Sequence, residues 1–367
     1  MQADTAARIF FDWCASEGML SEAPAIPTNS TAQDMGLITP KTEAGRLALR
    51  FKQVHAVASN EPQRRIIVFT RKAPPKGKKG LAAVPSMVDD VEVVYRQGAS
   101  ISVGAPLTAA TGNPTYLMRP SPVGEVYTCG SSVSVGNHRD AGTFGCLVRN
   151  AGGQLFGLSN NHVTGSCNFA GIGLPIVAPG IWDVAPNVLA PFTIGFHAQG
   201  LTLVAGAPDN VAWADNTDAA IFRINDPLKV SSYQGDAYDT PSTHAALDDN
   251  QVVEKVGRTT RHTTGRVLGK YHGPLFIPYS MPIHNFSGPV YFEPVYTIAG
   301  NGTLFSDAGD SGSLIVTTDP NGDRVAVGIV FGSIADASAP GGKLTLALPI
   351  SPILQRLNVS LVQGHNV

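Results

Sequence analysis

Apolar residues recur at helical spacing in two segments near the start of the chain. Residues 3–17 and residues 40–58 each place several apolar side chains on one face, as an amphipathic helix does. The second segment follows Thr39 and Pro40, which suit a helix cap and a first helical turn. The side chains expected to face inward are Ile9, Phe10 and Trp13 in the first segment, and Leu47, Phe51, Val54 and Ala58 in the second. The pattern predicts two N-terminal helices.

The helical pattern then gives way to strand patterns. Residues 64–71 and 91–97 are rich in β-branched and aromatic residues, and a loop that contains Pro and Gly separates them. Residues 104–124 carry Gly, Pro and Thr throughout, which interrupts any periodicity and is typical of a connector. We therefore expect residues 1–120 to form a small α+β module with its linker, and residues 121–367 to form a second, larger domain.

Beyond the connector, short apolar runs alternate with turn signals. They include GTFGCLVR, GQLFGLS, DAAIFRI, QVVEKV, GRVLGK, SLIV and AVGIVFG. Short strands at this spacing are typical of a barrel or sandwich of antiparallel strands. Residues 351–359 predict one short closing helix with Ile353, Leu354 and Leu357 inward. The expected fold class is mostly β with a small N-terminal α+β module.

The composition narrows the class of protein. Of the 367 residues, 43% are hydrophobic and 15% are charged, which favours a compact globular chain over a disordered one. Lys and Arg total 26 against 28 Asp and Glu, so a chain-wide surface for nucleic acid or an anionic membrane is disfavoured. The four Cys are too few for a disulfide framework, no Cys/His spacing suggests a metal, and nothing indicates a cofactor.

The start of the chain bears on its location. Residues 1–20 contain Asp4, Arg8, Asp12 and Glu17 among the apolar residues. A secretory signal needs an uninterrupted apolar core, and a membrane-spanning helix needs about 18 apolar residues in a row, which the sequence does not provide. We expect a cytoplasmic protein that does not enter a membrane.

Two segments rich in Lys and Arg are candidate binding sites for a partner or ligand. RKAPPKGKKG (residues 71–80) can grip an acidic partner or nucleic acid, but aromatic stacking residues are not interleaved, so a solvated loop is the preferred interpretation. GRTTRHTTGR (residues 257–266) can contact a ligand or partner, and an ordinary β-hairpin explains it more simply.

The segment most informative about chemistry is GDSGS, Gly309 to Ser313, just before the apolar run LIV. Glycines on either side of Ser311 permit a tight turn that exposes its hydroxyl. In such a turn the backbone N–H groups of Gly309 and Ser311 point into one small space, as an oxyanion hole requires. A serine hydroxyl is a poor nucleophile at neutral pH, so the hypothesis needs an imidazole base and a carboxylate that orients it.

Candidates for both groups lie upstream. His162, in LFGLSNNHVTG, follows an apolar strand, so its ring can project from the strand end into a cleft. Alone, it fits an ordinary turn histidine equally well, and only Ser311 and a carboxylate favour the functional role. Asp218, in NTDAAIFRI, opens another strand; an Asp there is often a turn former, and Asp215 competes with it. We prefer Asp218 because it enters the buried strand directly.

The order of these residues along the chain is His, Asp, Ser. The α/β-hydrolases have Ser, acid, His and the subtilisins have Asp, His, Ser, whereas chymotrypsin-like enzymes have His, Asp, Ser. With GTFGCLVR before LSNNHV, TDAAIFRI, and GDSGSLIV before AVGIVFGS, residues 125–360 resemble the chymotrypsin-like (trypsin-fold) serine peptidases. GTFGCLVR with LSNNHV, and the late LPISPILQRLNV, are especially similar to the trypsin-like peptidases of bacteria and the plant narrow-leaf protein group.

This resemblance implies a fold and an activity. Two antiparallel β-barrels would pack face to face, with His162 and Asp218 from the first barrel and Ser311 from the second meeting at the cleft. Peptide bonds would be hydrolysed through an acyl-enzyme. No RIVGG-like activation site precedes the barrel, where SSVSVGN stands, so the N-terminal insertion that pairs with the Asp before the nucleophile is not expected for Asp310.

The resemblance also assigns a substrate pocket, which departs from the trypsin pattern. The floor would be formed by Phe305 with Ser306 beside it, and the wall that pairs with the substrate backbone by Phe331, Gly332 and Ser333. Without an Asp at the floor, cleavage after Lys or Arg loses its main support. We expect a small or apolar side chain instead.

Two cysteines flank the candidate histidine. Cys146 and Cys167 fall about where many relatives have a disulfide that brackets it. Because the cytosol keeps thiols reduced, and Cys14 and Cys129 have no evident partner, we expect free buried thiols for all four.

The leading functional hypothesis is therefore a serine endopeptidase that acts on protein or peptide substrates. The alternative is a catalytically silent peptide-binding or scaffold protein of the same fold, whose cleft is blocked. A third hypothesis makes residues 1–120 a cleavable inhibitory segment. The N-terminal module can also position the catalytic domain, form a homo-oligomer or bind a regulatory protein.

Overall fold

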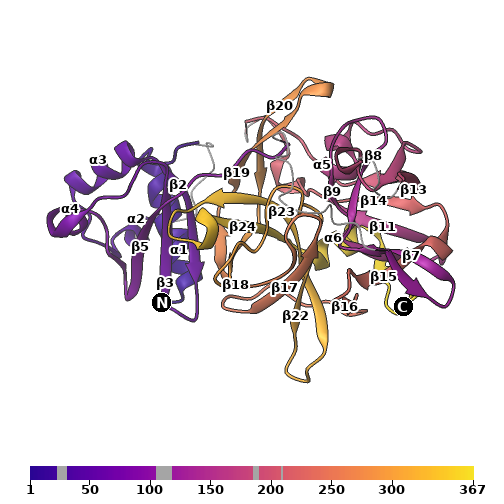
Figure 1. Ribbon diagram of the computed structural model, residues 1–367. Helices are drawn as coiled ribbons and strands as arrows, with labels where there is room; N and C mark the ends of the chain where they lie inside the picture. The colour runs from indigo at the N-terminus through magenta and orange to yellow at the C-terminus, as the bar shows by residue number, and fades with distance from the viewer. Residues whose placement is uncertain (23–30, 105–117, 185–189, 208–209) are drawn as a thin grey trace.

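Three parts follow one another across the molecule in the computed structural model. The N-terminal module (residues 1–97) lies at one end, the second barrel (residues 252–349) in the middle and the first barrel (residues 118–239) at the other end (Figure 1). The structure describes residues 1–22, 31–104, 118–184, 190–207 and 210–367. In these segments, no helix combines the length and the apolar character needed to cross a membrane.

The N-terminal module is a mixed sheet with helices. Its helices are α1 (Ala3–Ser16), α2 (Ala32–Met35), α3 (Glu43–Lys52) and α4 (Gly77–Ala83), and its strands are β1 (Ile38–Thr39), β2 (Val54–Asn60), β3 (Arg65–Thr70), β4 (Met87–Val88) and β5 (Val91–Gln97). The sheet order is β1-β4-β5-β3-β2, with β3 and β5 parallel. As the spacing predicts, α1 buries Ile9, Phe10 and Trp13 in a shared core with the sheet.

The second predicted helix, over residues 40–58, is wrong from residue 53 onwards. Helix α3 ends at Lys52, Gln53 turns the chain at a φ of 60°, and β2 begins at Val54. Leu47 and Phe51, expected to face inward, are 55% and 63% exposed. Strand β2 pairs with β3 on one side and with a strand of the second barrel on the other, and this tertiary pairing overrides a helical spacing of apolar residues.

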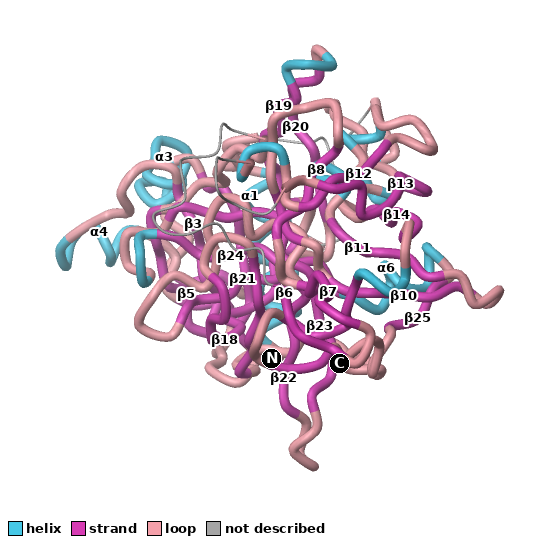
Figure 2. Tube along the Cα trace, turned by 45° about the vertical axis from the view of Figure 1, so that its right-hand side comes forward, coloured by secondary structure: helices cyan, strands magenta, loops and turns pink. Residues whose placement is uncertain are grey.

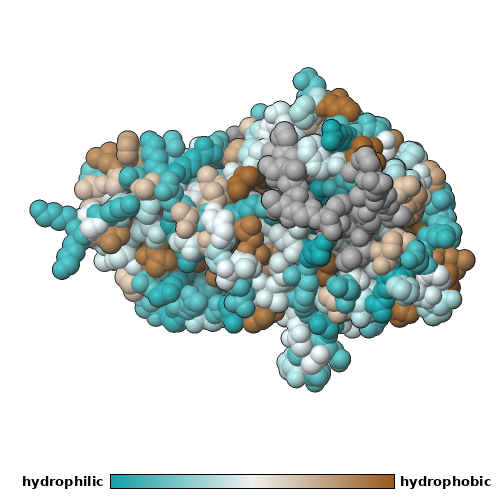
Figure 3. All heavy atoms as spheres, viewed as in Figure 1, coloured by the Kyte–Doolittle hydropathy of each residue, from teal (hydrophilic) through white to brown (hydrophobic). Residues whose placement is uncertain are grey.

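The basic segment 71–80 is only partly the loop that the sequence predicts. Its last residues begin the short helix α4, and Lys76, Lys78 and Lys79 are exposed. The side chains that project farthest at the α4 end of the molecule are hydrophilic, although hydrophobic atoms are also exposed near them (Figure 3). The side chains are thus solvated, as the preferred interpretation holds.

The first barrel is built from short strands, most of them antiparallel. They are β6 (Met118–Ser121), β7 (Gly124–Cys129), β8 (Ser132–Val135), β9 (Gly142–Thr143), β10 (Cys146–Asn150), β11 (Leu155–Ser159), β12 (Pro175–Ala178), β13 (Phe192–Gly200), β14 (Ala220–Ile224), β15 (Val230–Gln234) and β16 (Tyr238–Asp239), with the helical turn α5 (Asn161–Thr164). One sheet has the order β10-β11-β14-β13-β12-β8-β9, and another the order β16-β15-β7-β6 with β7 and β15 parallel.

The second barrel is closed. Its strands are β17 (Val252–Gly257), β18 (Arg261–His272), β21 (Tyr296–Gly300), β22 (Leu314–Thr318), β23 (Arg324–Ala335) and β24 (Lys343–Pro349). They pair in the order β18-β17-β22-β23-β24-β21, and β21 returns to β18. A separate hairpin of β19 (Leu275–Met281) and β20 (Phe286–Phe292) rises from one end (Figure 1). The mostly β fold with two barrels is as predicted.

Two further sequence predictions are confirmed in this half of the chain. Residues 257–266 contain the turn of a hairpin, since Gly257 of β17 faces Arg261 of β18. The closing helix is α6 (Ile350–Leu357), and its predicted inward residues, Ile353, Leu354 and Leu357, are buried. Strand β25 (Val359–Leu361) then returns to the first barrel and pairs with β10.

The N-terminal module shares its sheet with the second barrel. Ser59 and Val57 of β2 face Lys270 and His272 of β18, so one continuous sheet runs from β1 to β21. Figure 2 shows the strands of the two parts side by side from a second direction. Within the predicted connector, residues 105–117 lie outside the described residues, and residues 118–121 form β6, which pairs with β7. The division at residue 120 stays a prediction.

Residues 98–104, called the bridging segment below, tie the module to the barrel. The Ile101 N–H donates to the Ser333 carbonyl (2.9 Å), and the Ala335 N–H donates to the Ala99 carbonyl (2.9 Å), both at the edge of β23. The N–H of Ser100 donates to Nε2 of His55 (3.0 Å) in β2. Burial, together with the nearby Arg71 charge, lowers the pKa of His55 to about 3, so the ring stays neutral and can accept this bond.

Candidate active site

The ends of two neighbouring strands bring His162 and Asp218 together. Strands β11 and β14 pair with Ser159 opposite Ala220, and the two candidate residues lie just beyond this pair. His162 lies on the helical turn α5 rather than directly on a strand end. Its Nδ1 is 2.5 Å from Oδ2 of Asp218, and its backbone N–H donates to Oδ1 (2.9 Å). The sequence preference for Asp218 over Asp215 therefore agrees with the geometry.

The surroundings of His162 favour its protonated form. The ring is 7% exposed and Asp218 is fully buried. Burial lowers the pKa of His162, but the carboxylates of Asp218 and Asp140 outweigh it and raise the pKa above its ordinary value. Asp218 binds Nδ1, so Nε2 is the nitrogen left to act as a base towards a hydroxyl.

The loop that carries Ser311 is shaped by glycine. Gly309 and Gly312 have φ values of 95° and 98°, which side chains other than glycine rarely adopt. A Cβ on Gly312 would lie 2.3 Å from the Thr143 carbonyl, and one on Gly309 would lie 2.5 Å from Oγ1 of Thr259. Ser311 is left partly exposed between them.

A buried carboxylate anchors this loop from below. Asp310 is fully buried and accepts the N–H groups of Thr259 (2.7 Å), Thr260 (3.1 Å) and Asp307 (2.9 Å). The ammonium of Lys255, also fully buried, lies 3.3 Å from Oδ2 of Asp310. Lys255 of β17 thus pairs with Asp310, for which the sequence analysis expected no insertion of the chain's N-terminus as a partner.

The proposed oxyanion donors are free. Around Ser311, the N–H groups of Asp310, Gly312 and Ser313 donate to backbone carbonyls, whereas those of Gly309 and Ser311 have no acceptor among the described residues. Two unpaired donors on the turn that carries a serine hydroxyl suit an acceptor that arrives with a substrate.

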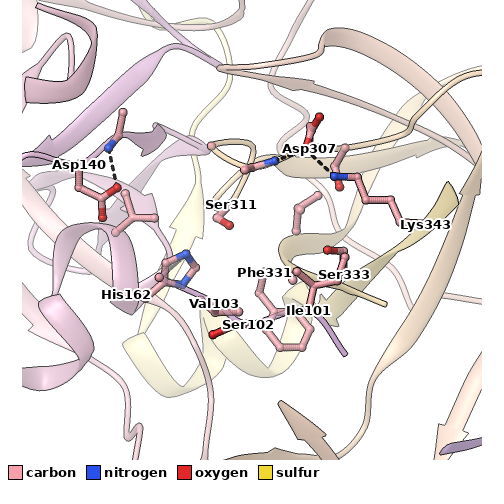
Figure 4. A pocket seen from close by; sticks show the side chains of 18 residues that line it. Ile101, Ser102, Val103, Asp140, His162, Asp307, Ser311, Phe331, Ser333 and Lys343 are labelled. Atoms are coloured by element: carbon pink, nitrogen blue, oxygen red, sulfur yellow. Dashed lines mark hydrogen bonds and ion pairs between the residues drawn. The ribbon is translucent and has the colours of Figure 1, made fainter. Parts of the chain in front are cut away.

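His162, Gly309 and Ser311 line one pocket (Figure 4). Ser311 lies between Asp140 and His162 on one side and the Asp307–Lys343 ion pair, 2.5 Å long, on the other. The pocket is also lined by Ile101, Ser102, Val103, Gly104, Ala141, Val163, Ser306, Ala308, Gly309, Val330, Phe331, Gly332 and Ser333. No hydrogen bond joins Ser311 to His162 within the described part of the chain; such bonds are often long in substrate-free structures.

Four of the five predicted pocket residues line the pocket. Ser306, Phe331, Gly332 and Ser333 line the pocket, but Phe305 does not. Phe305 is 2% exposed and packs in an apolar cluster inside the second barrel. The prediction that Phe305 forms the pocket floor is therefore wrong. The chain turns after Phe305, and Ser306, Asp307 and Ala308 line the pocket instead.

The bridging segment changes the expected substrate wall. Ile101 to Gly104 line the same pocket as Ser311. The carbonyl of Ser333, which the resemblance assigned to substrate pairing, already accepts the Ile101 N–H. Part of the expected peptide-binding edge is therefore used by the chain itself.

The four cysteines are free and buried, as the sequence predicts. Burial raises the pKa of both the Cys146 and the Cys167 thiols well above the ordinary value. Neither is a reactive thiolate at neutral pH.

Sequence reasoning missed four features of the site: Asp140, Lys255, Tyr279 of β19 and the bridging segment. The sequence did contain a sign that Lys255 is buried. Lys255 lies two residues after Val253 in VVEKV, so the two side chains share the inward face of the strand. Asp140 lies in a polar loop with no pattern to mark it, and the other two reach the site only through tertiary pairing.

Comparisons with known proteins give partial matches. No protein-family model matches the chain. It is 27% identical over 223 residues to Protein NARROW LEAF 1 of Oryza sativa subsp. japonica, covering 56% of this chain and 36% of that protein's length. Protease A of Thermobifida fusca aligns over 65% of this chain and 98% of its own, at 19% identity and a TM-score of 0.43. A chymotrypsin of Cellulomonas bogoriensis covers the same shares at 17% identity and 0.40.

Proposed function

We propose that the protein is a serine endopeptidase. Ser311 is the nucleophile, His162 the general base, and Asp218 the carboxylate that orients the imidazole. The observation that supports the proposal most is the buried His162–Asp218 pair, 2.5 Å apart, opening on the pocket that also holds Ser311.

The chemistry follows from this arrangement. Nε2 of His162 takes the Ser311 proton as Oγ attacks a peptide carbonyl, and the N–H groups of Gly309 and Ser311 stabilise the oxyanion. The imidazolium then gives its proton to the leaving amine, and an acyl-enzyme forms. Water repeats these steps on the ester and restores the serine. Asp218 stabilises the imidazolium throughout.

A fluorophosphonate probe tests the nucleophile directly. We expect the wild-type protein to be labelled at Ser311, and the Ser311→Ala variant to be unlabelled. Ser360→Ala, an exposed serine of β25, is the control and should be labelled like the wild type. Fluorescently labelled casein, with products identified by mass spectrometry, tests hydrolysis. No label at Ser311 and no products with the wild type would argue against a peptidase.

One observation favours a second candidate, a peptide-binding protein whose cleft is blocked. The bridging segment lines the pocket and takes up the Ser333 carbonyl. If it excludes substrate, the cleft of the intact chain is closed to long peptides. The same contact would make the segment inhibitory in an otherwise competent enzyme.

Ile101→Pro separates these candidates, because proline has no N–H to donate to Ser333. If the segment closes the cleft, the variant should hydrolyse casein faster than the wild type. If the segment is a wall of a working pocket, activity should fall or stay unchanged. Ile101→Ala keeps the N–H and controls for the lost side chain.

A further inference from the structure

Tyr279 lies directly behind the His162–Asp218 pair. Its hydroxyl donates to Oδ2 of Asp218 over 2.8 Å, and its side chain, from β19, is 2% exposed. The rings of Tyr279 and His162 meet edge to face, with centroids 6.1 Å apart and an interplanar angle of 81°. No element of the first barrel supplies this contact: it comes from the hairpin that rises from the second barrel.

The hydroxyl completes the bonding of a buried carboxylate. Oδ1 of Asp218 accepts the His162 backbone N–H, while Oδ2 faces both the imidazole Nδ1 and the Tyr279 hydroxyl. A fully buried carboxylate is stable only when such donors surround it. Burial and the Asp218 charge raise the pKa of Tyr279 well above its ordinary value, so the hydroxyl remains a donor. Asp140 and Cys167 are the other titratable groups that act on this cluster.

Tyr279 is itself held on two sides. Strand β20 pairs with β19, placing Gly288 opposite Tyr279. On the other side, Val103 of the bridging segment donates its N–H to the Pro278 carbonyl (2.9 Å) and accepts the Ser280 N–H (3.0 Å). Both neighbours of Tyr279 in the chain are thus bonded to the bridging segment, which fixes the direction of the phenol.

We propose that Tyr279 is a positioning residue that fixes the Asp218 carboxylate, and through it the imidazole of His162, for proton transfer from Ser311. It touches neither substrate nor the pocket and acts through Asp218 alone. The inference rests on the proposed peptidase function for its catalytic consequence, and on the geometry of the buried cluster for the positioning itself.

Tyr279→Phe removes only the hydroxyl. We expect kcat on a peptide substrate to fall about 10-fold with KM within about twofold, since a looser Asp218 holds the base less well. The hydroxyl proton competes with the imidazolium for Oδ2, so its loss favours the protonated ring. The acidic limb of the kcat/KM profile should therefore move up by about half a pH unit.

Tyr271→Phe is the matched control. Tyr271 is equally buried in β18, and its hydroxyl does not bond Asp218. If both variants lower the melting temperature but leave kcat and the pH profile at wild-type values, Tyr279 is merely structural and the proposal is overturned.

A measurement without turnover separates this proposal from the peptidase function. In 15N-histidine-labelled protein carrying Ser311→Ala, NMR titration gives the pKa of His162 with and without Tyr279→Phe. A higher pKa in the double variant supports the proposal, and an unchanged pKa overturns it. If the wild type hydrolyses nothing, the peptidase function fails while this titration still decides the role of Tyr279.

Discussion

Two clusters of Asp, His and Ser among the described residues differ in the order of their contacts. In the site, His162 contacts Asp218, and Ser311 lines the same pocket as His162. At the seam between the N-terminal module and the second barrel, the hydroxyl of Ser59 donates to Oδ1 of Asp4 (2.5 Å) and contacts Nε2 of His272 (2.8 Å).

The order of contacts separates the two clusters. The Ser59 proton is already directed at a carboxylate, and the residue is fully buried, so no substrate reaches it. Its cluster joins α1, β2 and β18, the elements that hold the module to the barrel. Residue types alone do not make a nucleophile: the imidazole must stand between carboxylate and hydroxyl, and the hydroxyl must face a pocket.

The two clusters should differ most when each loses its serine hydroxyl. Ser311→Ala should lower kcat/KM on a peptide substrate by about 10⁴-fold or more, because the proposed nucleophile is lost. Ser59→Ala should leave kcat/KM within about twofold at a temperature well below its melting point, and should lower the stability by about 1–2 kcal/mol. Equal losses of activity in the two variants would contradict the distinction.

The two clusters also have lysine–aspartate pairs that differ in burial. Lys255 and Asp310 under the Ser311 loop are both fully buried, whereas Lys270 and Asp4 at the seam are 34% and 45% exposed. Lys255→Met should lower the free energy of unfolding by about 3–5 kcal/mol, because Asp310 keeps a buried charge without its cation. Lys270→Met should cost less than about 1 kcal/mol. Urea unfolding measures the free energy of unfolding of both variants. Similar losses of stability would contradict the expectation that the buried pair matters more than the exposed one.

Acid should weaken the seam through Asp4. His272 and Ser59, against the opposing effect of burial, hold the pKa of Asp4 well below its ordinary 3.8. A carboxyl with a lowered pKa in the folded state contributes stability above its unfolded pKa and loses it as the pH falls further. Because the side chain is 45% exposed, we expect about 1 kcal/mol after solvent screening.

Stability measured from about pH 5 to pH 2 tests this expectation. Asp4→Asn should be less stable than the wild type at pH 5, and its stability should fall less steeply towards acid. A parallel decline in both proteins would mean that Asp4 is not a source of the pH dependence.

The smallest expected effect is the one that Asp140 has on the pKa of His162. Asp140 raises the pKa of His162, so Asp140→Asn should lower that pKa and move the acidic limb of kcat/KM to lower pH, by less than about one unit. Asp236→Asn removes the same charge at an exposed position and should leave the limb in place. A shift in the opposite direction would rule out the proposed effect of Asp140.

Local patterns predicted much of the site because its parts are local. Gly309 and Gly312 mark backbone conformations that other residues rarely adopt, so GDSGS reveals a special turn without any tertiary information. His162 and Asp218 stand beside apolar runs that become the neighbouring strands β11 and β14. Alternation within VVEKV even carried an unused sign of the buried Lys255.

Prediction failed where a distant partner decides the outcome. Residues 54–60 have apolar residues at helical spacing, yet they pair with β3 and β18 and form a strand. Phe305 sits near the serine in sequence but turns into the barrel core. Tyr279 is 61 residues from Asp218, and no short-range pattern connects them.

Local sequence patterns specified most of the strands in the two barrels, the glycine-shaped serine loop and the His, Asp, Ser order, since these depend on backbone preference and on residues near one another in the chain. Tertiary pairing was needed to establish which hydroxyl shares a pocket with an imidazole, which cation pairs with Asp310 and which segment lines the pocket. Those contacts join strands far apart in the sequence, and their energies depend on burial, which exists only once the strands have paired.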